Sequence, residues 1–202
     1  PEVARVVQGQ LTSGGVQKRY LAVTRGYTPD VGRVDRPLLE RRDRITDKQA
    51  ALNKPPQPAE TSFETWARAE LDVQLGRYPK TRFSLVEAQP HTGRRHQIRR
   101  HLAGLSYPLI GDTSHGRGEL NRYFRQDFNC HRLALASISL ELTHPTRGDA
   151  LVIRAPLSGS LARVCHDLFI APHGSPHDSL YRSARSPITP ALPKASCDWR
   201  TD

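Results

Sequence analysis

Residues 91–116 read HTGRRHQIRRHLAGLSYPLIGDTSHG, with four arginines and two histidines in the eight-residue stretch RRHQIRRH. Ile98, Leu102 and Leu105 follow one another at intervals of four and three residues. That spacing places the three side chains on one stripe of an α-helix. The segment therefore predicts a basic helix over residues 94–105, followed by a tight extended piece.

The arginines of this helix have two interpretations. Most charge runs form a solvated helix face and bind no specific ligand. In the alternative, Arg99 lies at the edge of the apolar stripe and lines a pocket, side by side with Arg95 one turn earlier, while neighbouring cations face phosphate groups. We expect Thr92 to cap the helix and Gly104 to help it end near Leu105.

Composition favours a polyanionic partner. The chain has 202 residues, a net charge of +10 and a pI of about 10.1. Such a charge favours nucleic acid over a membrane surface. No apolar run approaches the ~18 residues of a membrane span, and no secretory signal peptide is recognisable. We therefore expect RNA or another nucleic acid as the partner and no membrane association.

Cysteine and methionine usage bears on the setting and extent of the chain. Cys130, Cys165 and Cys197 are far apart and odd in number, which argues against a disulfide framework and favours a reducing, cytoplasmic setting. The sequence has no methionine and opens within a helical pattern, so we expect it to be the C-terminal portion of a longer product. We expect a monomer.

Alternating and helical patterns along the rest of the chain predict an α+β domain. Strands are expected over residues 17–25, 32–38, 61–73, 81–88, 133–142 and 151–154, and helices over 2–11, 120–128 and 160–170. The order of these elements predicts a mostly antiparallel mixed sheet with flanking helices. We assign residues 1–171 to one domain with a charged insertion at 40–58, and residues 172–202 to a disordered tail.

Strand alternation assigns side chains to faces of the sheet. In the strand over residues 17–25, Tyr20, Ala22 and Thr24 are expected on one face, opposite Leu21 and Val23. In the strand over residues 61–73, one shared face is expected to carry Phe63, Thr65, Ala67, Ala69 and Leu71.

Common catalytic and metal-binding motifs do not occur in the sequence. It contains no HExxH, Walker A, GxGxxG or Gly-x-Ser-x-Gly pattern, and its histidines lack metal-ligand spacing, so we expect no metal site. What remains is a basic surface beside a tyrosine, which fits an RNA backbone and a stacked base. The residues assigned to RNA binding are Lys18, Arg19, Arg94, Arg95, His96 and Arg100.

Four segments resemble motifs of the RluA-type pseudouridine synthases. TGRRHQIRRHLAGLSYPLIGD resembles the third motif of that family, and KRYLAVTRGY resembles its tyrosine motif. GRVDRPL and RLALASISLELTHPTRGDAL resemble the segment before the family's charged insertion and its closing strands. The resemblance covers about residues 1–170. ITDKQAALNKPPQPAETSF and GRYPKTRFSLVE make it most similar to the TruC type, which modifies tRNA (the uridine-65 type).

The resemblance implies a pseudouridine synthase fold, present in part, and an isomerase that converts uridine in RNA, here tRNA, to pseudouridine without cofactor or metal. In that family an aspartate attacks the ribose of a flipped-out nucleotide. By motif, Tyr20 would pack against the flipped base, Ile98 would line the pocket, and Arg99 would pair with the aspartate. A guanidinium fork in that place would hold the carboxylate ionised and oriented.

The nucleophilic aspartate is the missing part. The family's HRLDxxTSG motif does not occur in the sequence. Asp35 imitates it superficially within RVDRP but matches a different family segment, and we interpret Asp112 as a turn or capping residue. We therefore expect a synthase portion that is inactive alone. The alternative is a non-catalytic RNA-binding protein on a synthase-like fold, whereas the flanking strands argue against a DNA-binding helix-turn-helix.

Overall fold

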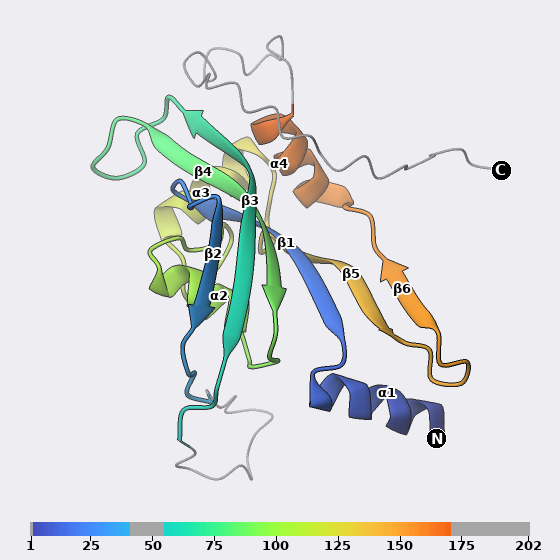
Figure 1. The fold of residues 1–202 in the computed structure, drawn as a ribbon. Helices are drawn as coiled ribbons and strands as arrows, with labels where there is room; N and C mark the ends of the chain where they lie inside the picture. Colours follow the sequence, from blue (N-terminus) through green and yellow to red (C-terminus); the bar gives the residue numbers. More distant parts are fainter. Residues whose placement is uncertain (1, 41–54, 171–202) are drawn as a thin grey trace, which may run out of the picture.

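The chain folds around a six-stranded antiparallel sheet with strand order β2-β3-β4-β1-β5-β6 (Figure 1). This computed structural model describes residues 2–40 and 55–170. The strands are β1 (Gln17–Arg25), β2 (Val31–Asp35), β3 (Glu60–Leu71), β4 (Thr81–Pro90), β5 (Leu135–Thr143) and β6 (Ala150–Arg154). The helices are α1 (Glu2–Ser13), α2 (Gln97–Gly104), α3 (Gly118–Asp127) and α4 (Gly159–Phe169).

This architecture confirms the predicted α+β class and the mostly antiparallel sheet with flanking helices. β1 has the predicted bounds, and the other strands and three of the helices lie within a few residues of theirs. The tail expected at 172–202 and most of the insertion expected at 40–58 lie outside the described residues.

The basic helix is shorter than predicted. α2 begins at Gln97, because the preceding residue His96 has a left-handed backbone with φ 54° and cannot continue a helix. Arg95 therefore precedes α2 and is not the helical neighbour of Arg99, contrary to the prediction. Thr92 does not cap α2 either, since its hydroxyl donates to Oε1 of Gln97 at 2.6 Å.

β1 runs through the middle of the sheet and supplies side chains to both faces. Leu21 and Val23 enter one core cluster, and Ala22 enters the other, with Tyr20 packed at its edge. The alternation predicted for these four residues is therefore confirmed. Because successive side chains of a strand point to opposite faces, β1 divides the domain into two cores.

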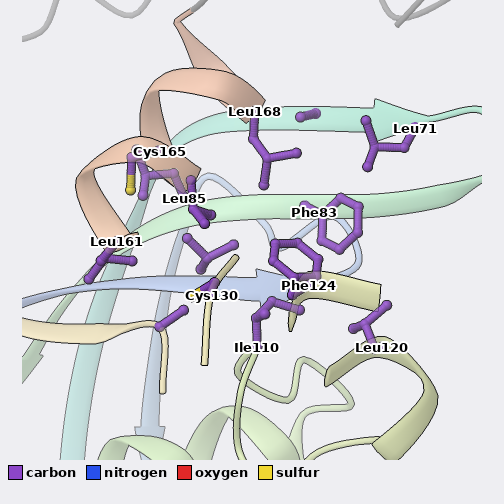
Figure 2. Packing of buried hydrophobic residues seen from close by; sticks show 14 of the residues in the cluster. Leu71, Phe83, Leu85, Ile110, Leu120, Phe124, Cys130, Leu161, Cys165 and Leu168 are labelled. Atoms are coloured by element: carbon purple, nitrogen blue, oxygen red, sulfur yellow. The ribbon is translucent and has the colours of Figure 1, made fainter. Parts of the chain in front are cut away.

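The larger core lies between the sheet and helices α3 and α4. Phe83 of β4 and Phe124 of α3 are both fully buried and meet edge to face, with ring centroids 5.3 Å apart. Leu168 of α4 and Leu71 of β3 lie near these rings, and Leu161 of α4 belongs to the same cluster nearer Cys130 and Cys165 (Figure 2). Burial of each such side chain contributes about 1.5–3 kcal/mol, so this cluster anchors one end of the sheet.

The smaller core lies on the opposite face, under α2. Ile98 and Leu102 are buried there against Ala22 of β1 and its neighbours. Leu105, the third residue of the predicted stripe, is 41% exposed. The stripe prediction is wrong for this residue because α2 ends at Gly104, one residue before it.

A β-bulge in β3 overturns one predicted face. The register with β4 shifts between Thr65 and Ala67, which makes Trp66 an extra residue. An extra residue reverses the side-chain alternation beyond it. Phe63 consequently packs in the core under α2, whereas Leu71 packs in the core beside α3 and α4. The prediction of one shared face along the whole of this strand is wrong.

Candidate functional site

Gly111 and Asp112 form the turn from which the site is built. Just before them the chain runs beside the end of β1, where the Ile110 N–H donates to the Val23 carbonyl at 3.0 Å. Gly111 then adopts φ +77°, and a Cβ added there would collide with the Arg132 carbonyl. Both conditions favour glycine. The turn leaves Asp112 facing Arg99 of α2.

Asp112 and Arg99 form a two-pronged ion pair. Nε of Arg99 donates to Oδ2 of Asp112 at 2.8 Å, and Nη2 donates to Oδ1 at 2.7 Å. The Asp112 side chain is 0% exposed and the Arg99 side chain 15%. Oδ1 also accepts the backbone N–H groups of Ser114 and His115 at 2.9 and 2.8 Å, the role expected of a turn residue. Both carboxylate oxygens are thus engaged, and the guanidinium is held in one orientation.

Opposing effects set the pKa of Asp112. Burial disfavours the charged carboxylate and would raise its pKa. The hydrogen bonds from Arg99, His115 and Ser114 outweigh burial and lower the pKa of Asp112 to about 2. The hydrogen bonds that Arg99 donates to Asp112 raise the pKa of Arg99 in turn. The pair therefore remains ionised at neutral pH.

Asn121 of α3 fixes the same turn from the other side. Its Oδ1 accepts the Gly111 N–H at 2.8 Å, and its Nδ2 donates to the Asp112 carbonyl at 2.9 Å. The residue is buried. This side chain connects α3, which packs on one face of the sheet, to the ion pair of α2, which packs on the other.

Tyr20 and Ile98, the other residues assigned to the pocket, both belong to the core under α2. Ile98 is buried in this cluster, and Tyr20 is half-buried at its edge. In the sheet, Tyr20 lies opposite Ala88 of β4 and Ser137 of β5. Because Ile98 directly precedes Arg99 on α2, the structure brings the tyrosine and the ion pair to the same face of the sheet.

Four of the residues assigned to RNA binding gather near the start of α2. Arg94, Arg95 and His96 lie in the turn before the helix. Lys18 of β1 reaches the same turn, because a Cβ built on Gly93 would lie 4.0 Å from its ammonium nitrogen. Arg94 and Arg95 are exposed, so this turn presents positive charge beside the pocket residues.

The other two lie elsewhere. Arg19 is two residues before Leu21 in β1, so the two side chains share a face of the sheet, opposite to the face of Tyr20. It forms an ion pair with Glu87 of β4 at 3.0 Å. Arg100 is half-buried on α2, and its Nη1 donates to the Leu39 carbonyl at 2.8 Å, next to the insertion.

His96 differs from its basic neighbours in charge. Burial lowers the pKa of its imidazole, and the nearby charges of Arg99 and Arg95 lower it further. The ring lies edge to face against His115, with centroids 5.9 Å apart. Because the ordinary pKa of 6.5 is already below neutral, the lowered pKa leaves the His96 imidazole mainly uncharged at pH 7.

Gln97 is a site-forming residue that sequence reasoning missed. Its Oε1 accepts the Thr92 hydroxyl at 2.6 Å and the Arg94 N–H at 2.9 Å. Its Nε2 donates to the Glu60 carbonyl at 2.8 Å and to Thr61 Oγ1 at 3.0 Å. This side chain ties the basic turn to the start of β3. The signal that could have identified it is its fixed place in TGRRHQIR, since neither its charge nor its spacing is distinctive.

Within residues 2–40 and 55–170, no three histidine, cysteine, aspartate or glutamate side chains gather as potential ligands of a metal ion. No helix in this part of the chain is long and apolar enough to cross a bilayer.

Comparison with known proteins gives relatives in sequence. The profile of the family described as RNA pseudouridylate synthase matches residues 1–104. The chain is 46% identical over 163 residues to tRNA pseudouridine synthase C of Salmonella typhi, covering 81% of this chain and 63% of that protein. It is 41% identical to tRNA pseudouridine synthase C of Vibrio cholerae over 156 residues, covering 77% and 64%. The chain therefore spans less than two thirds of the length of these curated relatives.

Solved structures share the fold. Human RNA Pseudouridylate Synthase Domain Containing 4 superposes with a TM-score of 0.58 at 24% identity, covering 81% of this chain and 66% of that one. Human RNA Pseudouridylate Synthase Domain Containing 1 gives a TM-score of 0.53 at 24% identity, covering 77% and 58%. With the profile match over half of the sequence, these comparisons establish that the chain belongs to the RNA pseudouridylate synthase family.

Proposed function

We propose that this chain is part of an isomerase that converts uridine to pseudouridine in tRNA and works in the cytoplasm as a monomer. The observation that carries the proposal is the Arg99–Asp112 ion pair beside the cluster of Tyr20 and Ile98. Further support comes from relatives named tRNA pseudouridine synthase C and from the net charge of +10, which suits a polyanionic substrate.

In this proposal each pocket residue keeps the role that its motif implies. Tyr20 packs against the flipped base, and Ile98 supplies the apolar wall beside it. Arg99 has two nitrogens committed to Asp112, whereas its Nη1 makes no hydrogen bond within residues 2–40 and 55–170. Nη1 is the donor that we assign to the carboxylate of the nucleophile. Asp112 is then a positioning residue, because it orients Arg99 without touching the substrate.

We propose further that no described aspartate is the nucleophile. The carboxylate of Asp112 is 0% exposed and fully hydrogen-bonded, so a ribose carbon has no access to it. Asp35 is exposed, but it ends β2, three strands away from Tyr20 on β1. Adjacent strands are about 4.8 Å apart, which separates the two residues by at least about 14 Å. The chain alone is accordingly expected to be inactive.

A tritium-release assay tests this function. The substrate is tRNA transcribed with 5-tritiated uridine, since formation of a carbon–carbon glycosidic bond at C5 expels the tritium. Two proteins are compared: the chain alone, and a longer version in which a segment carrying an HRLDxxTSG motif precedes Pro1. The control is the longer version with the aspartate of that motif replaced by asparagine.

The proposal requires release by the longer version and background release by both the chain alone and the control. Release by the chain alone would contradict the assignment of the nucleophile and point to Asp35 first. Within residues 2–40 and 55–170, Asp112 is inaccessible and Asp35 is distant from Tyr20, which also favours a second candidate, a non-catalytic RNA-binding protein. That candidate is preferred if both versions bind tRNA with a steep salt dependence and neither releases tritium.

A further inference from the structure

A basic hollow, separate from the turn before α2, lies at the end of β1 farther from Tyr20. It has a volume of about 960 Å³ and is enclosed by the β3–β4 hairpin loop, the turn after β1 and the start of α3. These elements meet at the upper left of Figure 1. We name it the hairpin cleft and define it by Arg25, Tyr27, Arg77, Tyr78, Arg82 and Arg117. Arg25 follows Tyr20 by five residues of extended chain, so the cleft is about 17 Å from the pocket residues.

Positive charge in this cleft is poorly neutralised. Arg25, Arg77 and Arg117 form no ion pair within the part of the chain that the structure describes. Glu119 is the carboxylate among the lining residues. Burial lowers the pKa of Arg25, and the neighbouring charges of Arg117 and Arg77 lower it further, although Arg25 stays ionised. Cations held together in a concave surface repel one another and raise the local affinity for a polyanion.

The cleft also carries two exposed aromatic rings held by arginines. Tyr78 is 51% exposed, and the guanidinium of Arg77 lies 4.8 Å from its ring centroid. Tyr27 is 37% exposed, and Arg82 lies 5.0 Å from its ring centroid. Arg82 in turn forms an ion pair with Glu70 at 2.7 Å, which fixes it as a support for the ring. Rings and guanidinium groups arranged in this way suit stacking of unpaired bases.

We propose that the hairpin cleft binds the sugar–phosphate backbone of an RNA strand, with Arg77 and Arg117 contacting phosphates and Tyr78 stacking on a base. The choice of RNA as the ligand rests on the proposed function. On that basis the cleft holds a part of the tRNA distant from the target nucleotide. Unpaired cations together with exposed rings distinguish such a site from one for a simple anion, which needs charge alone.

The test is the salt dependence of tRNA binding by the whole chain. A fluorescent unmodified tRNA transcript is titrated at several salt concentrations with wild type, with Arg77→Gln/Arg117→Gln, and with Arg147→Gln/Arg163→Gln. The last variant is the matched control, because it also removes two exposed positive charges but in the β5–β6 turn and on α4, away from the cleft. Loss of two phosphate contacts should lower the slope of log K against log salt by about 1.4–1.8. Affinity near physiological salt should fall about tenfold, while the control keeps the wild-type slope.

Three further comparisons make the result decisive. Arg77→Lys/Arg117→Lys should restore most of the slope, because it keeps both charges. Thermal melts of the glutamine variants should match wild type, because both side chains are exposed. Uridine monophosphate at millimolar concentration should compete weakly and equally with wild type and the glutamine variant.

Two results would overturn the proposal: an unchanged slope in Arg77→Gln/Arg117→Gln, or strong competition by uridine monophosphate that this variant abolishes. The latter would assign the cleft to a free nucleotide. Failure of the proposed function is seen separately. If the slope falls but the longer version releases no tritium, the cleft stands as an RNA site and the isomerase is rejected.

Discussion

The Arg99 site and the hairpin cleft both concentrate arginine, but they treat its charge in opposite ways. In the first, Arg99 is 15% exposed and gripped by a carboxylate that is itself 0% exposed. In the second, Arg77 and Arg117 are exposed and form no ion pair within residues 2–40 and 55–170. A buried ion pair fixes the orientation of its side chains, because breaking the pair would leave a buried charge without a partner and without water. Surface cations without an ion pair do not hold a neighbouring side chain in one orientation, but they attract a polyanion.

The difference assigns different tasks to the two regions. Orientation of a single group matters most where bonds change, since misplacement by about 1 Å can cost about a hundredfold in rate. Affinity for a long polyanion depends instead on the number of phosphates that are neutralised. Changes at the Arg99 site should therefore alter turnover and stability, whereas changes in exposed arginines should alter the salt dependence of RNA binding.

The largest effect is expected from Arg99→Ala in the longer version of the protein. Turnover in the tritium-release assay should be abolished, because the nucleophile loses the donor that we assign to it. The affinity for tRNA should stay within about twofold of wild type, since Arg99 is not counted among the phosphate contacts.

A second variant separates this role from folding. Arg99→Lys keeps the charge but lacks the planar fork, so turnover should still fall about a hundredfold while the protein remains folded. Arg163→Lys on the exposed side of α4 is the control and should be fully active. Near-normal turnover in Arg99→Lys would show that charge alone suffices and that the fixed geometry is irrelevant.

Gly111→Ala should have the next largest effect, on the stability of the Arg99 site. A Cβ at this position meets the Arg132 carbonyl, and alanine disfavours φ +77°. The free energy of unfolding in urea should fall by about 3 kcal/mol. Gly118→Ala is the control, because a Cβ there meets nothing within 4 Å and the residue lies in a helix. A similar loss in both variants would contradict the role of the turn.

The sequence predicts the helices and strands of this fold more completely than it predicts the geometry of the site. The sequence predicts the alternation of side chains between the two faces of β1, because each of these faces is buried and apolar. The sequence does not predict that the alternation in β3 reverses at Trp66, since a bulge depends on packing across strands rather than on the local pattern. The predicted helix is also longer than α2, because no sequence pattern near His96 indicates its left-handed backbone.

The site itself divides in the same way. The motif resemblance predicts that Arg99 pairs with the nucleophilic aspartate, and the sequence indicates only a turn or capping role for Asp112. Thirteen residues separate the two, and their contact depends on how α2 packs against the loop after it. The hairpin cleft draws on Arg25, Arg77 and Arg117, which lie in three distant segments. Because these arginines do not recur at a regular spacing in the sequence, their cluster can be recognised only in the folded chain.

The pH dependence of stability should reveal the carboxylate of Asp112. Its pKa of about 2 in the folded chain lies below the ordinary value of 3.8, so the folded state binds this proton more weakly than the unfolded state. The stabilisation is therefore present above about pH 4 and is lost as the pH falls toward 2, and it amounts to about 2 kcal/mol.

Urea unfolding between about pH 5 and pH 2 measures this effect. Wild type should lose about 2 kcal/mol more than Asp112→Asn over that range, because the variant has no proton to bind at this position. Asp149→Asn is the control, since Asp149 is 57% exposed in the turn between β5 and β6. Parallel curves for wild type and Asp112→Asn would mean that the pair with Arg99 does not depress the pKa of Asp112 as described.

The smallest effect concerns single exposed arginines that lie on opposite sides of the sheet. Arg95→Gln in the basic turn should lower the salt slope of tRNA binding by about 0.7–0.9, the value for one phosphate contact. Arg19→Gln should change it far less, because Arg19 lies on the other face of the sheet and its charge is already matched by Glu87. Equal losses would place RNA on both faces and return Arg19 to the list of phosphate contacts. A loss in Arg95→Gln alone would place RNA at the basic turn and leave Arg19 without a phosphate contact.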